Sequence, residues 1–505
     1  MKKKMIAIGL GIVIVVMNAC ASAPSKSGEN EAPAIKNDSA MWNRFEYDSE
    51  TYLTINENKI KEAVEDSAVT VSLKVDTAAY TNVARYIASG QLPPQEAVKT
   101  EEFLNYFSYE NQMEEKQGPF YISAEIGDSP YDDTKKIALI RVKTEEIEKE
   151  ELPPSNLTFL IDTSGSMDSY DKLPLLKEAF TLLVETLGEH DKVSIVTYAG
   201  SSEVVLNGAA GTDKFEMIDA IHRLQAGGST YGEGGIQTAY ELAGENFIEG
   251  GNNRIILATD GDFNVGVHSE SDLEQLITRK RESGIDLSIL GFGTGNLKDS
   301  RMETLSKYGN GNYSYISSVD DAKKVLVEEL GSTLFTVASD VKAQVEFNPG
   351  SVSNYRLIGY ENRMMDNEDF DDDGKDAGEI GAGSDMVMMF ELEMAKGADA
   401  KEQEELFELR IRYKEPGEKE SREILQAAYR EDMTDRPSED FRFSLAVAGF
   451  AHLLRESEAM GDLDIEQIKA IAKDNMGADA GNYRKEFIKL INSYLDLPGS
   501  RKYVI

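Results

Sequence analysis

Leu157-Thr158-Phe159-Leu160-Ile161 is a near-continuous apolar run that leads directly into the polar loop Asp162-Thr163-Ser164-Gly165-Ser166. Similar runs follow at Val193–Tyr198, Arg254–Thr259 and Asp286–Phe292. Such runs are typical of parallel strands that are buried on both faces. Segments with helical spacing of apolar residues alternate with them: Lys172–Leu187, Lys214–Leu224, Ile236–Phe247, Asp272–Ser283 and Asp320–Leu334. The alternation predicts a doubly wound, Rossmann-like α/β sheet over residues 155–335.

Three short polar pieces are predicted to meet at one edge of this sheet, each at the end of a strand. They are Asp162 to Ser166, the glycine-rich Gly228-Ser229-Thr230-Tyr231-Gly232, and Thr259-Asp260-Gly261-Asp262. Ligands of such sheets bind at the carboxyl ends of the strands. Each piece alone is typical of an ordinary turn or helix cap, so the prediction of a site depends on all three together.

The oxygen-bearing side chains of these pieces suit a hard divalent cation, which prefers octahedral oxygen coordination. We expect Asp162 to anchor the ion through its carboxylate or a bound water, and Ser164 and Ser166 to direct their hydroxyls to the same point. Thr230 would add a hydroxyl from a neighbouring loop, and Asp260 would act from the opposite side through water. One carboxylate and three neutral hydroxyls leave the ion enough positive charge to attract a carboxylate from another molecule.

Asp162-x-Ser164-x-Ser166, then Thr230, then Asp260 resembles the metal-ion-dependent adhesion site (MIDAS) of von Willebrand factor type A domains. The resemblance covers residues 155–335. It implies a bound divalent cation, with Mg²⁺ favoured and Mn²⁺ or Ca²⁺ as alternatives. It also implies a protein partner that offers an Asp or Glu carboxylate. We interpret Asp262 as a solvated loop acid rather than a part of this site.

The flanking segments contain runs in which apolar and polar residues alternate, as in strands with one wet face. These runs are Tyr121–Ile126, Lys136–Lys143, Val341–Phe347 and Phe407–Tyr413. Because each flank alone has few strands with which to bury a face, we expect both flanks to build one β-sandwich. Helical spacing is found at Ala79–Ser89 and Pro94–Phe107, and again at Phe441–Arg455, Asp464–Lys473 and Arg484–Leu495.

Motifs in both flanks resemble bacterial lipoproteins related to YfbK. On the amino-terminal side these are Val75-Asp76-Thr77-Ala78-Ala79-Tyr80, Gly90-Gln91-Leu92-Pro93-Pro94 and Glu101-Glu102-Phe103-Leu104-Asn105-Tyr106-Phe107. On the carboxyl-terminal side these are Tyr355-Arg356-Leu357-Ile358-Gly359-Tyr360 and Asp376-Ala377-Gly378-Glu379-Ile380-Gly381. The resemblance implies architecture and location, and adds little about biochemical function.

The amino terminus is typical of an export signal. Lys2, Lys3 and Lys4 precede the short apolar run Met5–Met17, and Cys20 follows. This arrangement resembles a bacterial lipobox and implies cleavage before Cys20 and lipidation of its thiol. We therefore expect an extracytoplasmic protein held at the cell membrane or outer membrane by acyl chains.

The sequence thus predicts seven segments. They are a lipoprotein signal peptide (1–20), a flexible tether (21–50), an N-terminal domain associated with the α/β domain (51–117), strands that pair with the C-terminal region (118–154), the α/β domain (155–335), a β-rich domain (336–430) and a helical segment (431–505).

Composition excludes several classes of protein. The net charge of −38 would repel the phosphates of nucleic acid, so we expect no nucleic-acid partner. With Cys20 as the sole cysteine, neither an intrachain disulfide nor a cysteine-type zinc site can form. Within the acidic stretch from Asp366 to Asp376, the run that starts at Asp369 begins like a calcium loop, but Ile380 stands where the bidentate glutamate is required. We interpret that stretch as a solvated loop.

These features predict a membrane-anchored protein-binding, adhesion or scaffold module rather than an enzyme. Ser166 and Ser229 are not in a nucleophile elbow and have no histidine nearby in the sequence. Two alternatives stay open at this point. One is a metal-assisted hydrolase that uses Asp260 or Asp262 as a base, and the other is a structural envelope protein with a vestigial site.

Overall fold

The computed structural model describes residues 50–109, 116–148, 151–230, 232–261, 270–396, 404–461 and 463–500. The predicted signal peptide, Cys20 and the tether up to residue 49 lie outside these residues, as does Asp262. The described residues all belong to one compact unit, Tyr47–Ile505. In the part of the chain that the structure describes, no helix combines the length and the apolar character needed to cross a bilayer.

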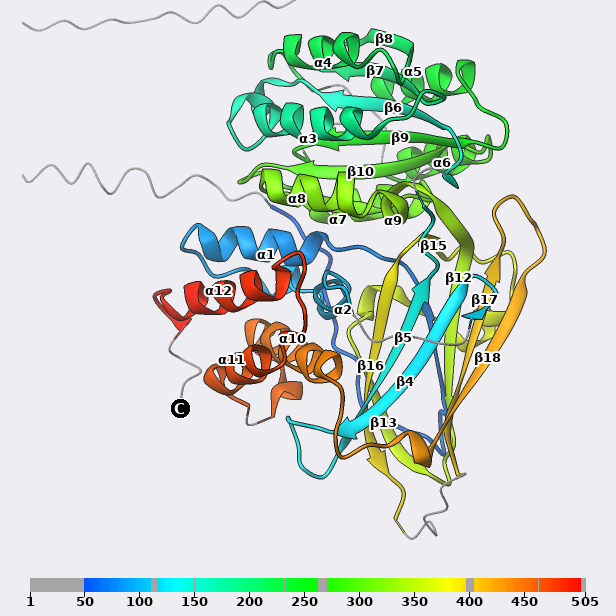
Figure 1. Ribbon diagram of the computed structural model, residues 1–505, viewed down its shortest axis with the longest axis vertical. Helices are drawn as coiled ribbons and strands as arrows, with labels where there is room; N and C mark the ends of the chain where they lie inside the picture. The colour runs from blue at the N-terminus through cyan, green and yellow to red at the C-terminus, as the bar shows by residue number, and fades with distance from the viewer. Residues whose placement is uncertain are drawn as a thin grey trace, which may run out of the picture. The chain divides into compact units, whose positions relative to one another are not determined.

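The α/β domain contains the predicted doubly wound sheet, with strand order β11-β10-β9-β6-β7-β8 (Figure 1). All neighbours are parallel except β7 and β8, which are antiparallel. The strands are β6 (Ser155–Asp162), β7 (Lys192–Tyr198), β8 (Ser202–Ala210), β9 (Asn252–Thr259), β10 (Asp286–Phe292) and β11 (Tyr313–Ile316). The helices are α3 (Leu173–Thr186), α4 (Lys214–Arg223), α5 (Gly232–Glu245), α6 (Glu270–Arg281), α7 (Asp299–Tyr308), α8 (Val319–Lys323) and α9 (Leu330–Leu334).

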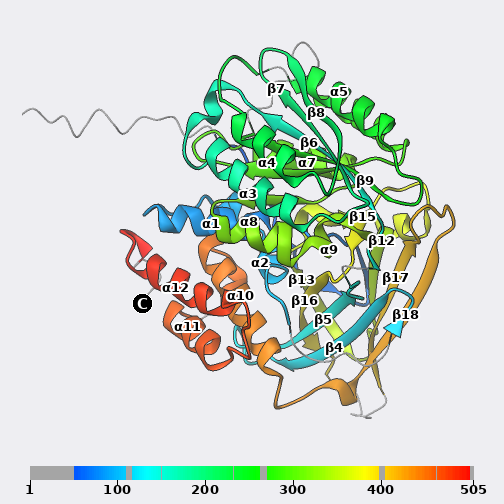
Figure 2. The same ribbon diagram turned by 45° about the horizontal axis from the view of Figure 1, so that its top comes forward.

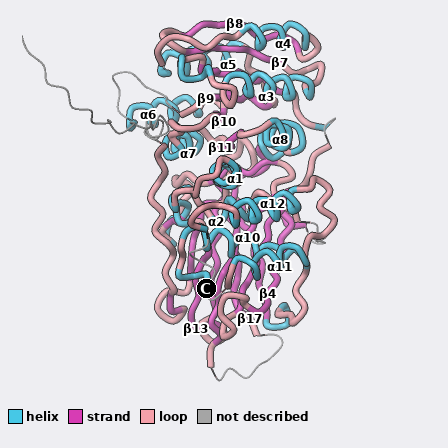
Figure 3. Tube along the Cα trace, turned by 90° about the vertical axis from the view of Figure 1, so that its left-hand side faces the viewer, coloured by secondary structure: helices cyan, strands magenta, loops and turns pink. Residues whose placement is uncertain are grey.

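Alternation along β6 explains why helices cover both faces of this sheet. Leu157, Phe159 and Ile161 pack in one core with α3, α4 and α8. Leu160 points the other way and packs in a second core with α5, α6 and α7. Figure 3 shows α6 and α7 on one side of β9 and β10, with α3 and α8 on the other. The fold class predicted from the sequence is therefore confirmed.

Two further six-stranded sheets form a sandwich from both flanks of the α/β domain (Figure 2). One sheet has the order β1-β13-β16-β5-β4-β3, and the other has the order β14-β2-β12-β17-β18 with β15 beside β12. The strands before the α/β domain are β1 (Lys61–Glu62), β2 (Ala68–Ser72), β3 (Lys116–Gln117), β4 (Phe120–Asp128) and β5 (Lys136–Thr144). Those after it are β12 (Thr336–Phe347), β13 (Val352–Ile358), β14 (Met364–Met365), β15 (Gly378–Gly381), β16 (Asp385–Met394), β17 (Glu405–Lys414) and β18 (Arg422–Tyr429).

Strands from the two flanks pair directly. β5 is antiparallel to β16, and β2 is antiparallel to β12. The inward positions predicted from alternation lie in the sandwich core: Val341, Ala343, Val345, Phe347, Phe407, Leu409, Ile411 and Tyr413. Each flank therefore completes the hydrophobic face of the other.

Helices from both ends of the chain share the remaining core. They are α1 (Ala78–Ala88), α2 (Thr100–Leu104), α10 (Glu439–Arg455), α11 (Ile465–Asp474) and α12 (Tyr483–Leu495). Tyr80 of α1 stacks on Tyr106 with ring centroids 4.0 Å apart, and Phe487 of α12 packs edge-on against Phe450 of α10. Leu139 and Met389 join the same core from the outer face of a sandwich sheet, so the helices cover that face.

Three predicted elements differ from the structure. Pro94–Phe107 was expected to be one helix, but it contains a 3₁₀ turn (Gln95–Ala97) and the five-residue α2. Asp320–Leu334 is divided by a π-helical turn (Lys324–Glu328) between α8 and α9. The loop around Thr230 was expected at a strand end, but it follows α4 and precedes α5.

Candidate metal site

Asp162 is the last residue of β6 and has no solvent-exposed surface. Its Oδ1 accepts a hydrogen bond of 2.8 Å from the Ser164 backbone N–H. Its Oδ2 accepts hydrogen bonds of 3.2 Å from the Tyr198 and Thr259 hydroxyls. Burial raises the pKa of Asp162 to about 6, against the hydrogen bonds from Ser164 and with help from nearby Asp260. Asp162 is thus a buried carboxylate that, among the described residues, is held by neutral donors and has no cationic partner.

Ser164 and Ser166 connect Asp162 to Asp260. The Ser164 backbone N–H donates to the Asp162 carboxylate, and Ser164 Oγ lies 3.0 Å from Ser166 Oγ. The Ser166 side chain in turn helps to lower the pKa of Asp260. Ser164 is buried and Ser166 is exposed, so the cluster opens to solvent on the Ser166 side. Four of the five predicted ligands therefore form one continuous group.

Asp260 follows β9 and is fully buried. Its Oδ2 accepts hydrogen bonds of 2.9 Å from Lys172 Nζ and from Asn296 Nδ2. Burial acts to raise the pKa of Asp260, but the Lys172 ammonium and the hydrogen bonds from Asn296, Lys172 and Ser166 outweigh it and hold this pKa below its ordinary value. The two carboxylates therefore differ in charge compensation. Asp260 forms an ion pair with Lys172, whereas Asp162 has no cationic partner among the described residues.

The loop that carries Thr230 is drawn to the same place by its backbone. Gly227 N–H donates to Thr163 O at 2.8 Å, and Gly165 N–H donates to Gly228 O at 3.1 Å. Thr230 itself is half-buried, and its hydroxyl has no hydrogen-bond partner within the described residues. The structure thus brings the backbone of the Thr230 loop to the cluster, and the role of the Thr230 hydroxyl stays a prediction.

These residues fit a hard divalent cation. The donors are carboxylate and hydroxyl oxygens, the uncompensated charge of Asp162 calls for a cation, and one side is open. In the described ranges no group of three or more His, Cys, Asp or Glu side chains is placed to hold a metal, so this site depends on its hydroxyls. Sequence reasoning missed Lys172 and Asn296, which lie far from Asp260 in the sequence and carried no motif signal.

The first described residues lie beside this site. Glu50 Oε1 accepts a hydrogen bond of 2.7 Å from Gly295 N–H, one residue before Asn296. Thr51 N–H donates to Leu297 O at 3.0 Å, and Ser300 N–H donates to Thr51 O at 3.1 Å. Arg85 binds the Glu50 carboxylate through both of its terminal nitrogens, at 3.0 and 2.8 Å. The chain therefore enters the described fold on the loop that supports Asp260.

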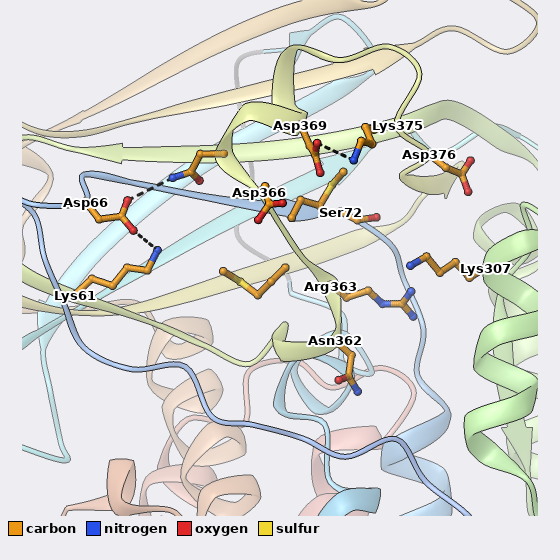
Figure 4. Close-up of a pocket in the computed structure, with 13 residues that line it drawn as sticks. Lys61, Asp66, Ser72, Lys307, Asn362, Arg363, Asp366, Asp369, Lys375 and Asp376 are labelled. Atoms are coloured by element: carbon orange, nitrogen blue, oxygen red, sulfur yellow. Dashed lines mark hydrogen bonds and ion pairs between the residues drawn. The ribbon is translucent and has the colours of Figure 1, made fainter.

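A polar pocket of about 560 Å³ lies elsewhere, lined in part by Lys61, Lys307, Arg363 and Lys375 (Figure 4). Most of its cations already have acidic partners. Lys61 pairs with Asp66 at 2.6 Å, Lys375 pairs with Asp369 at 3.0 Å, and Arg363 pairs with Asp76 and Glu303. The pocket shares no residue with the Asp162 cluster.

Family models match three parts of the chain. They are "von Willebrand factor" at residues 46–139, "von Willebrand factor type A domain" at 156–329, and "Uncharacterized protein YfbK, C-terminal" at 332–497. The resemblance predicted for the central domain and for its flanks is therefore confirmed.

Among individual proteins, the chain is 42% identical over 462 residues to the uncharacterized protein YfbK of Escherichia coli K12. The aligned region covers 87% of this chain and 80% of YfbK. It is 30% identical over 151 residues to pig inter-alpha-trypsin inhibitor heavy chain H4, which covers 28% of this chain and 16% of that protein. A solved structure, von Willebrand factor type A from Catenulispora acidiphila, is 15% identical with a TM-score of 0.42 and covers 76% of this chain and 91% of that chain.

Proposed function

Because this chain belongs to the YfbK family and contains a von Willebrand factor type A domain, we propose that it is a cation-dependent protein-binding module held at a bacterial membrane. Domains of this type generally mediate protein–protein interactions. In this proposal a divalent cation, Mg²⁺ first, is bound by Asp162, Ser164, Ser166, Thr230 and Asp260. A carboxylate of a protein partner then takes the open position on the cation.

The observation that carries the proposal is the state of Asp162. Its carboxylate is completely buried, yet no described cation is within ion-pair distance of it. A buried carboxylate without a cationic partner is costly, and a metal ion would relieve this cost. The exposed Ser166 hydroxyl supports an accessible ion. The proposed role is binding, and it requires neither a nucleophile nor a general base.

Anchoring is a separate part of the proposal and rests on Cys20. Lipidation of this thiol after signal cleavage would place the protein at an extracytoplasmic membrane surface. Labelling of cells with an alkynyl palmitate should mark the wild type and leave Cys20→Ser unmarked. A labelled C20S protein would contradict this anchor while leaving the metal site untouched.

The metal site is tested by calorimetry with Mg²⁺ and Mn²⁺. Wild type should bind one ion per chain, and Asp162→Ala should lose at least about ten-fold in affinity, because a carboxylate ligand contributes a large share of the binding of a hard cation. Asp168→Ala is the matched control, since Asp168 is an exposed acid in the same loop. If D162A kept the affinity of wild type, the proposed site would be wrong.

Partner binding is tested by crosslinking in native membranes, with and without a chelator. A protein that is crosslinked to wild type and to D168A, but neither to D162A nor in the presence of EDTA, would support the proposed contact. A crosslink that survives in EDTA and in D162A would instead favour a structural role in which the site is vestigial.

A further inference from the structure

Lys172 places an ammonium group inside the candidate metal site. This residue is the N-cap of α3 and is 6% exposed. Its Nζ lies 2.9 Å from Asp260 Oδ2 and 2.9 Å from Asn296 Oδ1. Asn296 Nδ2 donates to the same Asp260 oxygen, so the three polar groups close a ring of hydrogen bonds.

The backbone makes room for this lysine. Gly293 has φ +78°, and a Cβ at that position would lie 2.3 Å from both Cγ and Cε of Lys172. The loop after β10 thus leaves a channel for the lysine stem and then supplies Asn296 to hold its head. A side chain that is enclosed along its stem and bonded at its tip is fixed in place, in contrast to a surface lysine that happens to lie near an acid.

Because Lys172 pairs with Asp260 alone, it neutralises one of the two carboxylates of the site and leaves the other, Asp162, charged. The Lys172–Asp260 pair is nearly neutral as a unit, with side chains 8% and 0% exposed. Of the two described carboxylates of the site, Asp162 is the one whose negative charge has no cationic partner among the described residues. A divalent ion bound here would meet a net protein charge of about −1 rather than −2, so it would retain close to one positive charge.

We propose that Lys172 is a specificity-determining residue, which weakens the binding of the metal alone and strengthens the binding of a carboxylate ligand to the metal-loaded site. This inference rests on the proposed metal-binding function. Without the ammonium, two acidic side chains would nearly neutralise the ion, and a further anion would gain little from it. With the ammonium, the loaded site attracts a carboxylate and discriminates against uncharged ligands, so metal and acidic partner each favour the binding of the other.

The experiment compares wild type with Lys172→Met, Lys172→Arg and Lys307→Met. Methionine keeps an apolar stem and removes the charge, whereas arginine keeps the charge. Lys307→Met is the matched control, because Lys307 is an exposed lysine of the same domain, on α7.

The first readout is calorimetric titration with Mn²⁺ alone. The second is the relaxation rate of water protons on the Mn²⁺-loaded protein as acetate displaces bound water. Thermal unfolding without metal checks that each variant is folded.

We expect K172M to bind Mn²⁺ at least about ten-fold more tightly than wild type, and its Mn²⁺-loaded form to bind acetate at least about ten-fold more weakly. K172R and K307M should remain within about two-fold of wild type in both measurements. Equal or weaker Mn²⁺ binding by folded K172M would overturn the inference while leaving the proposed metal site standing. If K172R behaved as K172M does, the fit of the lysine would matter rather than its charge, and the inference would be wrong. Wild type that binds no Mn²⁺ would instead refute the proposed function itself.

Discussion

Lys99 Nζ lies 2.8 Å from Glu303 Oε2, and both side chains are buried although 204 residues separate them. Lys99 also lies 3.1 Å from Asp299 Oδ2, and both acids belong to α7. Arg363, from the C-terminal flank, reaches Glu303 at 3.5 Å. These buried ion pairs join the α/β domain to both of its flanks.

Replacement of this lysine should therefore destabilise the whole compact unit. Lys99→Met leaves buried Asp299 without its lysine and leaves Glu303 with Arg363 alone, and we expect the free energy of unfolding to fall by about 3–5 kcal/mol. Urea denaturation measures the change. Lys323→Met is the matched control, because Lys323 pairs with Glu328 on the surface and its loss should change the free energy of unfolding very little. Equal effects of the two substitutions would show that the buried pairs contribute little.

Glu379 should make stability depend on pH. Burial raises the pKa of Glu379 from 4.5 to about 8, and nearby Asp286 adds to the shift. Between these values the unfolded chain has released this proton and the folded chain still holds it, so the contribution of Glu379 to the free energy of unfolding falls as pH rises from about 4.5 to about 8. Glu379→Gln removes this loss. We expect E379Q to match wild type near pH 5 and to be more stable by about 3 kcal/mol at pH 8.5. Denaturant titrations at both pH values test this, with exposed Glu420→Gln as the control. A constant difference between wild type and E379Q across this range would contradict the assignment.

Thr230 and Ser229 form a natural pair for testing the fifth predicted ligand. If the Thr230 hydroxyl binds the cation, Mg²⁺ should raise the melting temperature of wild type and of Ser229→Ala by several degrees, and that of Thr230→Ala clearly less. Differential scanning calorimetry with Mg²⁺ and with EDTA gives the shift. If T230A responds to Mg²⁺ as strongly as wild type, Thr230 is only a loop residue.

Gly293 should be intolerant of a side chain. Gly293→Ala brings a Cβ within 2.3 Å of the enclosed Lys172 stem at a positive φ, and we expect a loss of about 2–3 kcal/mol of stability. Gly295→Ala has a similar φ of +88° with no atom within 4 Å of the new Cβ, so it isolates the backbone effect and should cost about 1 kcal/mol. In Lys172→Ala the channel is empty, and G293A should there cost little more than G295A. Chemical denaturation of wild type, G293A, K172A and the double variant forms a double-mutant cycle. Additive losses would show that Gly293 and Lys172 do not interact.

The sequence predicted those parts of the fold that are encoded by local patterns. Four buried parallel strands and the inward faces of β12 and β17 follow directly from runs and alternation of apolar residues. The edge strand β8 was missed because most of its residues are exposed or half-buried and show no clean alternation. The polar helix α7 was missed for a similar reason, since its buried positions include Asp299 and Glu303, whose partners Lys99 and Arg363 lie far away in the sequence.

The sequence likewise predicted the part of the candidate site that local motifs encode. Asp162, Ser164 and Ser166 are neighbours in the sequence, and Asp260 follows a recognisable strand, so their convergence could be expected. The ring formed by Lys172, Asn296 and Asp260 could not, because it depends on the path of the loop after β10. A lysine at the start of a helix is otherwise typical of a solvated surface position.

The contact between Glu50 and Gly295 ties the first described residues to the loop that carries Asn296. Tension on the chain upstream of Glu50 would act first on the Arg85 clamp and on the backbone bonds between Thr51 and the loop at Leu297 and Ser300. Loss of these bonds would free the loop at Gly295 and Asn296. Asn296 donates a hydrogen bond to Asp260, so Asp260 would lose part of its support. If Cys20 anchors the chain as proposed, a pull from that side would therefore act on the loop beside the candidate metal site before it reached the sandwich or the helical core.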